Sequence, residues 1–557
     1  MKPAVRYGGN IEEHPAVEGP IVLWARNVLF LVVVGGGVVA LGANLLPPRK
    51  PAQISRYDVP DYRDPRFREV VERVDDSFRQ QWLSEGIKPA APAADLLQAR
   101  RVALGLMGTV PSLEEIRQFE ALPPDQRMPW WIDHVLADSR FADYFAERLA
   151  RSYVGTEDGP FIFYRRRRFV TWLAEQVAAN RPYDQVVRSL IATEGLWTDQ
   201  PATNFVSVTV QNDNKNQPDP VRLAGRVTRA FLGLRLDCAQ CHNHPFAEWR
   251  QTDFQGFSAF FGQTQVGFRG IRDADGEYEV EDPKSKLKTV VPPRVPFATE
   301  LLPDRGSRRE RLAAWVTHPK NPYFARAAVN RVWALMLGRP LVEPVDNLQT
   351  GDVVHPALDI LASDFAAHDF DLRRLIRIIA STQVFRLDSA ADHDVGETEE
   401  RVWAVFPLTR LRPEQVAGSV LQAASIATID SESHILVRLA RLGQQNEFVQ
   451  RYGDTGEDEF DGRGGTIPQR LLLMNGKLVR ERIQASPLNA TTRIAWIAPN
   501  DPKAVEVAYL AVLSRRPTPN EAAHFERFLA DPSLDRPQRL EDLFWALINS
   551  TEFSWNH

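Results

Sequence analysis

Trp130–Val154, which reads WWIDHVLADSRFADYFAERLARSYV, is the stretch that decides the fold class. Its large apolar residues recur every three or four positions, which is the period of one helix face. They are Trp131, Ile132, Val135, Leu136, Phe141, Tyr144, Phe145 and Leu149. Upstream, Ser112-Leu113-Glu114-Glu115 has the capping-box pattern that starts a helix. Helical periodicity resumes at Arg308 and continues to Ile548, so the sequence predicts a mainly α-helical protein.

The composition is that of an ordinary globular protein. Of 557 residues, 44% are apolar and 25% are charged, which excludes a disordered or collagen-like chain. The 67 Lys and Arg residues against 72 Asp and Glu residues give a net charge of −5. This balance argues against a polycationic protein, so no nucleic-acid partner is predicted. With two cysteines, the chain is not a disulfide scaffold.

A membrane segment is predicted at residues 28–46, VLFLVVVGGGVVALGANLL, which contain no charged side chain. As a helix these 19 residues would span about 28 Å, close to the ~30 Å hydrocarbon core of a bilayer. The alternative is a signal peptide cleaved near Ala40-Leu41-Gly42. We expect an uncleaved anchor because the apolar run is long for a signal peptide.

The predicted organisation is a transmembrane helix followed by two largely α-helical domains, with a small irregular or β connector between them. Turn residues and prolines between residues 263 and 306 mark this connector. The segments are a tail (1–27), the transmembrane helix (28–46), a linker (47–90), a first α domain (91–262), the connector (263–306) and a second α domain (307–557).

Both cysteines lie in Cys238-Ala239-Gln240-Cys241-His242, a C-x-x-C-H pattern. This is the attachment pattern of c-type haem. Each thiol can add to a haem vinyl group, and the adjacent imidazole of His242 can become the axial iron ligand. Met474 is a candidate for the second axial ligand. The pattern therefore predicts haem c at Cys238, Cys241 and His242.

Two other roles for the motif stay open. Thiolates and imidazoles also suit zinc, and Cys238, Cys241, His242 and His244 could supply four ligands, although their spacing is tighter than usual. The cysteines could instead form a plain disulfide. Because the sequence lacks the common nucleotide, serine-hydrolase and zinc-protease motifs, no enzyme class is predicted.

Several blocks resemble a known pair of domains. Residues 229–246, Trp249 and residues 257–261 closely resemble the planctomycete-type cytochrome-associated domain of unknown function. The later blocks resemble the partner domain of unknown function that usually follows it. These blocks are residues 311–315, 321–326, 330–333, 355–356, 381–386, 411–415 and 549–553. The likeness covers about residues 90–555 and implies an exported, envelope-associated protein without an assigned reaction.

These observations favour a single-pass inner-membrane protein with its bulk in the periplasm. Haem attachment takes place outside the cytoplasm, and this sets the expected orientation. The first hypothesis is a c-type haem or metal-binding electron-transfer subunit with a redox partner in the envelope. The second is a structural or assembly subunit of an envelope complex, with a disulfide or zinc at the motif.

Overall fold

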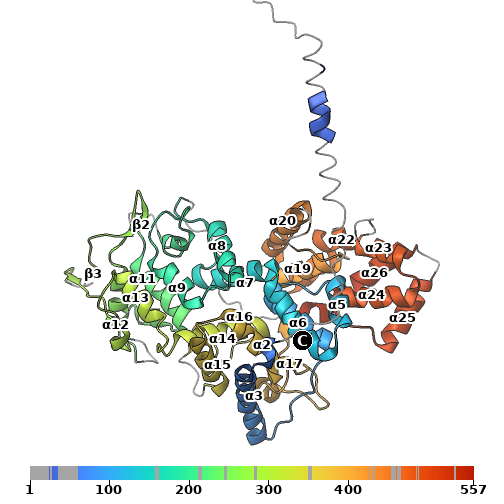
Figure 1. Ribbon diagram of the computed structural model, residues 1–557, viewed down its shortest axis with the longest axis horizontal. Coiled ribbons are helices and arrows are strands. Elements are labelled where there is room, and N and C mark those ends of the chain that lie inside the picture. The colour runs from blue at the N-terminus through green and yellow to red at the C-terminus, as the bar shows by residue number, and fades with distance from the viewer. Residues whose placement is uncertain are drawn as a thin grey trace, which may run out of the picture. The chain divides into compact units, whose positions relative to one another are not determined.

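The computed structural model is mainly helical, as predicted (Figure 1). The structure describes residues 24, 28–35, 60–156, 162–210, 216–243, 248–281, 285–348, 354–425, 427–430, 433, 435–452, 460, 466–484, 486, 489–531 and 535–557. No described helix is long and apolar enough to cross a membrane. Residues 28–35 of the predicted anchor are helical and exposed, and residues 36–46 lie outside the described residues.

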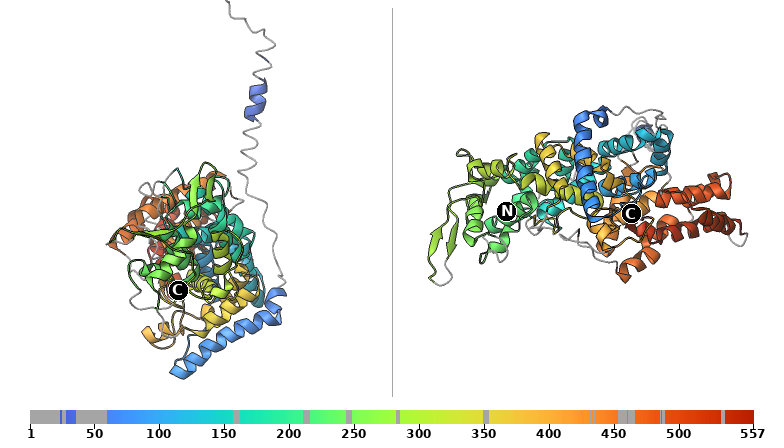
Figure 2. Two further views of the ribbon diagram at one scale, coloured as in Figure 1. Left: turned by 90° about the vertical axis from the view of Figure 1, so that its left-hand side faces the viewer. Right: turned by 90° about the horizontal axis from the view of Figure 1, so that it is seen from below.

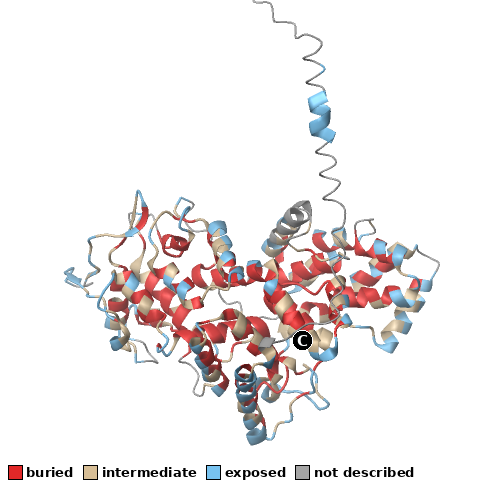
Figure 3. Ribbon diagram, in the orientation of Figure 1, coloured by how far each residue is buried: buried red, intermediate tan, exposed pale blue. Residues whose placement is uncertain are grey.

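The first hydrophobic core runs from Phe67 to Phe406. Its helices are α2 (Pro60–Arg63), α3 (Pro65–Glu85), α4 (Asp95–Met107), α5 (Leu113–Ala121), α6 (Pro124–Ala137), α7 (Ser139–Val154), α8 (Arg166–Ala178), α9 (Tyr183–Ala192), α10 (Asn204–Ser207), α11 (Pro220–Val227), α12 (Gln251–Ser258), α13 (Arg308–Val316), α14 (Phe324–Leu337), α15 (Pro356–Ala367), α16 (Leu372–Ser381), α17 (Gln383–Arg386) and α18 (Glu397–Arg401). Buried residues extend along all the longer helices of this set (Figure 3).

The second core joins the C-terminal helices to the start of the folded chain. Its residues lie between Leu411 and Phe553, together with Leu104, Val110, Leu113 and Ile116 from α4, α5 and the turn between them. The C-terminal helices are α19 (Pro413–Ala423), α20 (Ile435–Tyr452), α21 (Ile467–Asn475), α22 (Lys477–Ile483), α23 (Ala490–Ile497), α24 (Asp501–Leu513), α25 (Pro519–Ala530) and α26 (Arg536–Ile548).

The predicted division near residues 262–307 does not separate two cores. The first core contains residues from both predicted α domains, and the chain instead changes core between Phe406 and Leu411. The reason is that α14, α15 and α16 bury their apolar faces against helices that precede the connector. The connector is therefore not the place where the chain passes from one core to the other.

The connector contains short hairpins, in agreement with the predicted β character. β1 (Thr264–Gly267) pairs antiparallel with β2 (Gly270–Asp273), and β3 (Glu279–Glu281) pairs antiparallel with β4 (Lys288–Val290). Ile271 of β2 is fully buried and exchanges both backbone hydrogen bonds with Gly195. A third short pair, β5 (Thr409–Arg410) with β6 (Trp555–Asn556), ties the C-terminus to the segment between the cores.

The prediction of a linker over residues 47–90 is wrong for its second half. Residues 65–85 form α3, which lies beside α15 and α16 (Figures 1 and 2). Asp64 caps its start by accepting a hydrogen bond from the Arg66 N–H, and Gly86 ends it in the left-handed conformation. The buried face of α3 carries Phe67, Val70, Val74, Phe78 and Trp82. This apolar face makes the segment part of the first core.

A close backbone approach at Gly418 holds α19 against the end of α4. A Cβ atom at this position would lie 2.3 Å from the carbonyl oxygen of Gly108. The hydroxyl of Thr109 also donates a hydrogen bond to the Gly418 carbonyl over 3.0 Å. Residue 418 must therefore be glycine for the two backbones to meet.

We expect Gly418→Ala to lower the free energy of unfolding by about 1–3 kcal/mol, because the added methyl group forces two backbones apart. Gly443→Ala is the matched control, since α20 leaves open space around that position. This control should be neutral or stabilising by up to about 1 kcal/mol through helix propensity. Urea unfolding followed by circular dichroism measures the free energy of unfolding of both variants. Equal changes in Gly418→Ala and Gly443→Ala would contradict the close approach.

Candidate functional site

The C-x-x-C-H loop follows a helix end that is fixed by a glycine. Gly233 has φ +58°, and a Cβ atom there would lie 2.9 Å from the Leu348 side chain. The short helix η3 (Leu236–Ala239) comes next and buries Leu236 and Ala239 in the first core. Because these two residues point inward, Cys238 and Cys241 are left exposed at the surface, as free thiols.

The His242 imidazole has a defined tautomer. Its Nδ1 lies 2.7 Å from the backbone carbonyl oxygen of Asn243. A carbonyl oxygen only accepts hydrogen bonds, so Nδ1 is the donor, and in the neutral imidazole the lone pair is then on Nε2. The side chain of Gln251 on α12 donates to the carbonyls of Gln240 and Cys241, which fastens the loop to that helix. An exposed Nε2 is thus available as a metal ligand.

Of the other two predicted ligands, the structure describes Met474 alone. His244 lies outside the described residues. Met474 lies on α21, which packs against α22 and the second core, and its carbonyl accepts a hydrogen bond from Trp545. Since α12 and α22 are far apart in Figure 1, the structure does not bring Met474 to the loop. The structure thus gives no support from proximity to the prediction of Met474 as an axial ligand.

A cavity of about 680 Å³ borders the loop, and we name it the arginine cavity. Asp237, next to Cys238, and Gln240, next to Cys241, line it together with the end of α7, α11 and the segment 340–346. Its charged lining consists of Arg151, Arg222, Arg226, Arg229, Arg235, Arg331, Asp219, Asp237, Glu343 and Asp346. Arg222, Arg226 and Arg229 recur at helical spacing in the sequence, but no local pattern could place Arg331 beside them, because it is about a hundred positions away.

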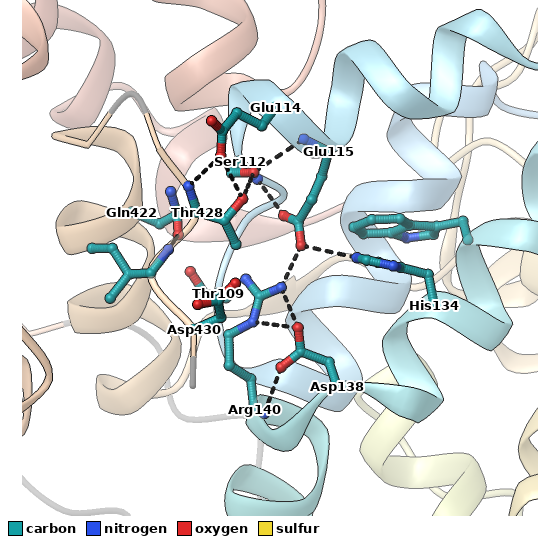
Figure 4. Close-up of polar contacts among 12 residues, drawn as sticks. Thr109, Ser112, Glu114, Glu115, His134, Asp138, Arg140, Gln422, Thr428 and Asp430 are labelled. Carbon is teal, nitrogen blue, oxygen red and sulfur yellow. Dashed lines mark hydrogen bonds and ion pairs between the residues drawn. The ribbon is translucent and has the colours of Figure 1, made fainter. Parts of the chain in front are cut away.

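A second polar cluster joins α5, α6 and α7, and sequence reasoning missed it (Figure 4). One ligand atom each of Glu115, His134 and Asp138 lies within 4.8 Å of the others. The Arg140 guanidinium bridges the carboxylates of Glu115 and Asp138, with 2.7 Å to Asp138. Because this cation already occupies the space between the carboxylates, we interpret the cluster as an ion-pair network and not as a metal centre.

The electrostatics of Glu115 follow from this network. Burial alone would raise its pKa, but Arg140 and the hydrogen bond from His134 outweigh burial and lower the pKa to about 2. Its other carboxylate oxygen accepts a hydrogen bond from the Ser112 N–H, which completes the predicted capping box of α5. The Ser112 and Thr428 hydroxyls, 2.7 Å apart, extend the network to the segment after α19. The cluster therefore holds together helices of both cores.

Fold and site define a class: a mainly helical protein with an exposed C-x-x-C-H loop beside an arginine-lined cavity. Comparison with protein families places the chain more closely. Residues 73–266 match the family PSCyt2, a protein of unknown function (DUF1549), and residues 308–434 match PSD1, a protein of unknown function (DUF1553). The chain therefore matches both domains of unknown function, in the order that the resemblance in the sequence implied. No curated protein and no solved structure matches it.

Proposed function

We propose that the protein is an envelope electron-transfer subunit that carries one c-type haem at Cys238 and Cys241, with His242 as axial ligand. The observation that carries this proposal is the C-x-x-C-H loop, which presents two free thiols at the surface beside a cavity. When bound, the haem iron would take up and release one electron. The helical shell would set its access to solvent and to a redox partner.

The thiols suit covalent attachment because they are reachable and not bonded to each other. In thioether formation the S–H adds across a haem vinyl group. A C–S bond forms, the π bond is lost, and the thiol hydrogen moves to the other vinyl carbon. Both sulfurs must be accessible for this addition, and the burial of the intervening Ala239 keeps the loop in the position that exposes them.

The imidazole of His242 suits axial ligation. A ligating histidine commonly donates its second ring N–H to a carbonyl or carboxylate, which fixes the ring and its tautomer. The contact from Nδ1 to the Asn243 carbonyl supplies this second interaction. The volume of the arginine cavity, about 680 Å³, falls within the ~300–1,000 Å³ typical of pockets for organic ligands and cofactors.

The loop supports zinc and disulfide less well. Among the described residues, ligand atoms of Cys238, Cys241 and His242 do not gather within 4.8 Å of one another, as a prepared zinc site would require. The sulfurs are also not bonded to each other. A structural or assembly subunit with zinc or a disulfide is the alternative that the experiment below distinguishes.

The proposed location is the periplasmic face of the inner membrane, with residues 28–46 as the single anchor. Support comes from the uncharged apolar run in the sequence and from the chemistry of haem attachment, which takes place outside the cytoplasm. The partner would be a redox protein of the envelope.

We expect the full-length protein, when produced with haem-attachment machinery, to give a haem-stained band on a denaturing gel and a reduced-minus-oxidised visible spectrum. The double variant Cys238→Ala/Cys241→Ala should lose the stain completely, because no thioether can form. His242→Ala should change the spectrum through the axial ligand, whereas the exposed control His524→Ala should not.

Absence of a Soret band from the wild-type protein under these conditions would overturn the haem proposal. Stoichiometric zinc, or a mass two hydrogens below that of the reduced chain without a prosthetic group, would instead favour the structural subunit. Intact-protein mass spectrometry and metal analysis of the same sample separate these outcomes.

A further inference from the structure

Arg331 is a buried cation for which the part of the chain that the structure describes supplies no counter-charge. It lies on α14, is 7% exposed, and lines the arginine cavity. Among the described residues, no hydrogen bond and no ion pair reaches its guanidinium. Its electrostatic neighbours are the hydroxyls of Tyr153 and Tyr183, which bond to each other over 3.0 Å. A buried charge that lacks a partner is costly, so its persistence calls for a ligand.

The carboxylates that line the cavity all have other partners. Asp237 binds Arg229 at 2.7 Å, and Asp346 binds Arg235 at 2.8 Å. Asp219 caps α11 by accepting hydrogen bonds from two backbone N–H groups. Glu343 lies 3.7 Å from Arg339. None of the carboxylates in the described cavity wall therefore neutralises the charge of Arg331.

The described lining carries six arginines and four carboxylates. Arg151 is paired with Glu147 and Glu414, which lie outside the lining, so the case for an acidic ligand rests on Arg331. Guanidinium groups bind carboxylates and phosphates through paired hydrogen bonds, and these are stronger in a low-dielectric cavity. The volume of about 680 Å³ leaves room for an organic molecule and not only for a small ion.

We propose that the arginine cavity binds the carboxylate group of an organic anion, with Arg331 as the buried counter-charge. One source of such a group is a propionate of a haem tethered at Cys238 and Cys241, and the other is a free organic acid. The proposal does not depend on haem attachment, because Arg331 lines the cavity whether or not a haem is tethered to the loop.

The test uses full-length protein produced without haem-attachment machinery, with two probes. Mesoporphyrin IX presents two propionates on a tetrapyrrole, and citrate presents carboxylates alone. We expect saturable binding of one or both by titration calorimetry, and at least ~10-fold weaker binding to Arg331→Met. Arg331→Lys should recover part of the loss, since it restores the charge without the paired hydrogen bonds.

Matched controls separate a ligand contact from a structural effect. Arg326→Met removes an arginine of the same helix, which pairs with Asp359 and does not line the cavity, so binding should be unchanged. The dimethyl ester of mesoporphyrin should bind weakly if the carboxylates are recognised. Binding of mesoporphyrin without citrate assigns the site to a tetrapyrrole, and binding of citrate alone assigns it to a free acid.

Protein stability gives an independent readout. If Arg331 lacks a partner, Arg331→Met should be at least as stable as the wild-type protein without ligand, because an uncompensated buried charge has been removed. A large loss of thermal stability in Arg331→Met would overturn the proposal, and so would equal affinity of wild type and variant or no binding of either probe. Cys238→Ala/Cys241→Ala should retain probe binding, so a failure of the haem proposal is recognised separately.

Discussion

Replacing Phe78 with alanine is expected to lower the free energy of unfolding by about 3–5 kcal/mol. The ring is fully buried and stacks on His355 at 4.0 Å and on Trp333 at 5.9 Å, measured between ring centroids. Truncation removes these contacts and leaves a cavity that the rigid aromatic neighbours cannot fill. Urea unfolding monitored by circular dichroism measures the loss.

Leu83→Ala is the control for this prediction. Leu83 lies on the same helix α3 but is 82% exposed, so its truncation should change stability by less than about 0.5 kcal/mol. A similar small effect at Phe78 would show that α3 is not part of the first core.

The same substitution has a spectroscopic consequence at His355. Burial lowers the pKa of this imidazole to about 4, and its Nδ1 accepts a hydrogen bond from the Ala357 N–H at the start of α15. Opening the stack in Phe78→Ala admits water, so this pKa should rise toward the ordinary value near 6.5. An NMR titration of the histidine signals reports this shift.

Glu115→Gln is expected to lower the free energy of unfolding by about 3 kcal/mol at neutral pH. The substitution keeps the shape but removes the charge that faces Arg140, and the buried guanidinium keeps only Asp138 as its ionic partner in Figure 4. The exposed carboxylate of Glu69 on α3 gives the control Glu69→Gln, which should be nearly neutral.

The pH dependence of the Glu115 effect has a definite sign. The folded-state pKa of about 2 lies below the ordinary value of 4.5, so the unfolded chain binds more protons between these values. The stabilisation is fully present above about pH 4.5 and is lost as the pH falls toward 2. The difference between wild type and Glu115→Gln should therefore narrow below pH 4.5; a constant difference would contradict the ion-pair interpretation.

The family comparison and the helical content agree with the sequence, but the organisation of the cores does not. The sequence prediction includes residues 65–85 in the linker, because the proline- and arginine-rich segment before them has no helical period. The buried residues Phe67, Val70, Val74 and Phe78 do recur with a helical period, so the sequence could have predicted this helix. The sequence could not predict that residues from both sides of the connector share one core, because that depends on which helix faces meet.

The sequence by itself determined the helical class, the capping box at Ser112, the C-x-x-C-H motif and the pair of families, because each is written in local spacing or in contiguous blocks. Only the tertiary structure decided that Arg331 lines a cavity beside Cys238, that Met474 lies elsewhere, and that Arg140 bridges Glu115 and Asp138. Those relations join residues on different helices. They arise from the packing of apolar faces, which carries polar side chains together without leaving a pattern along the chain.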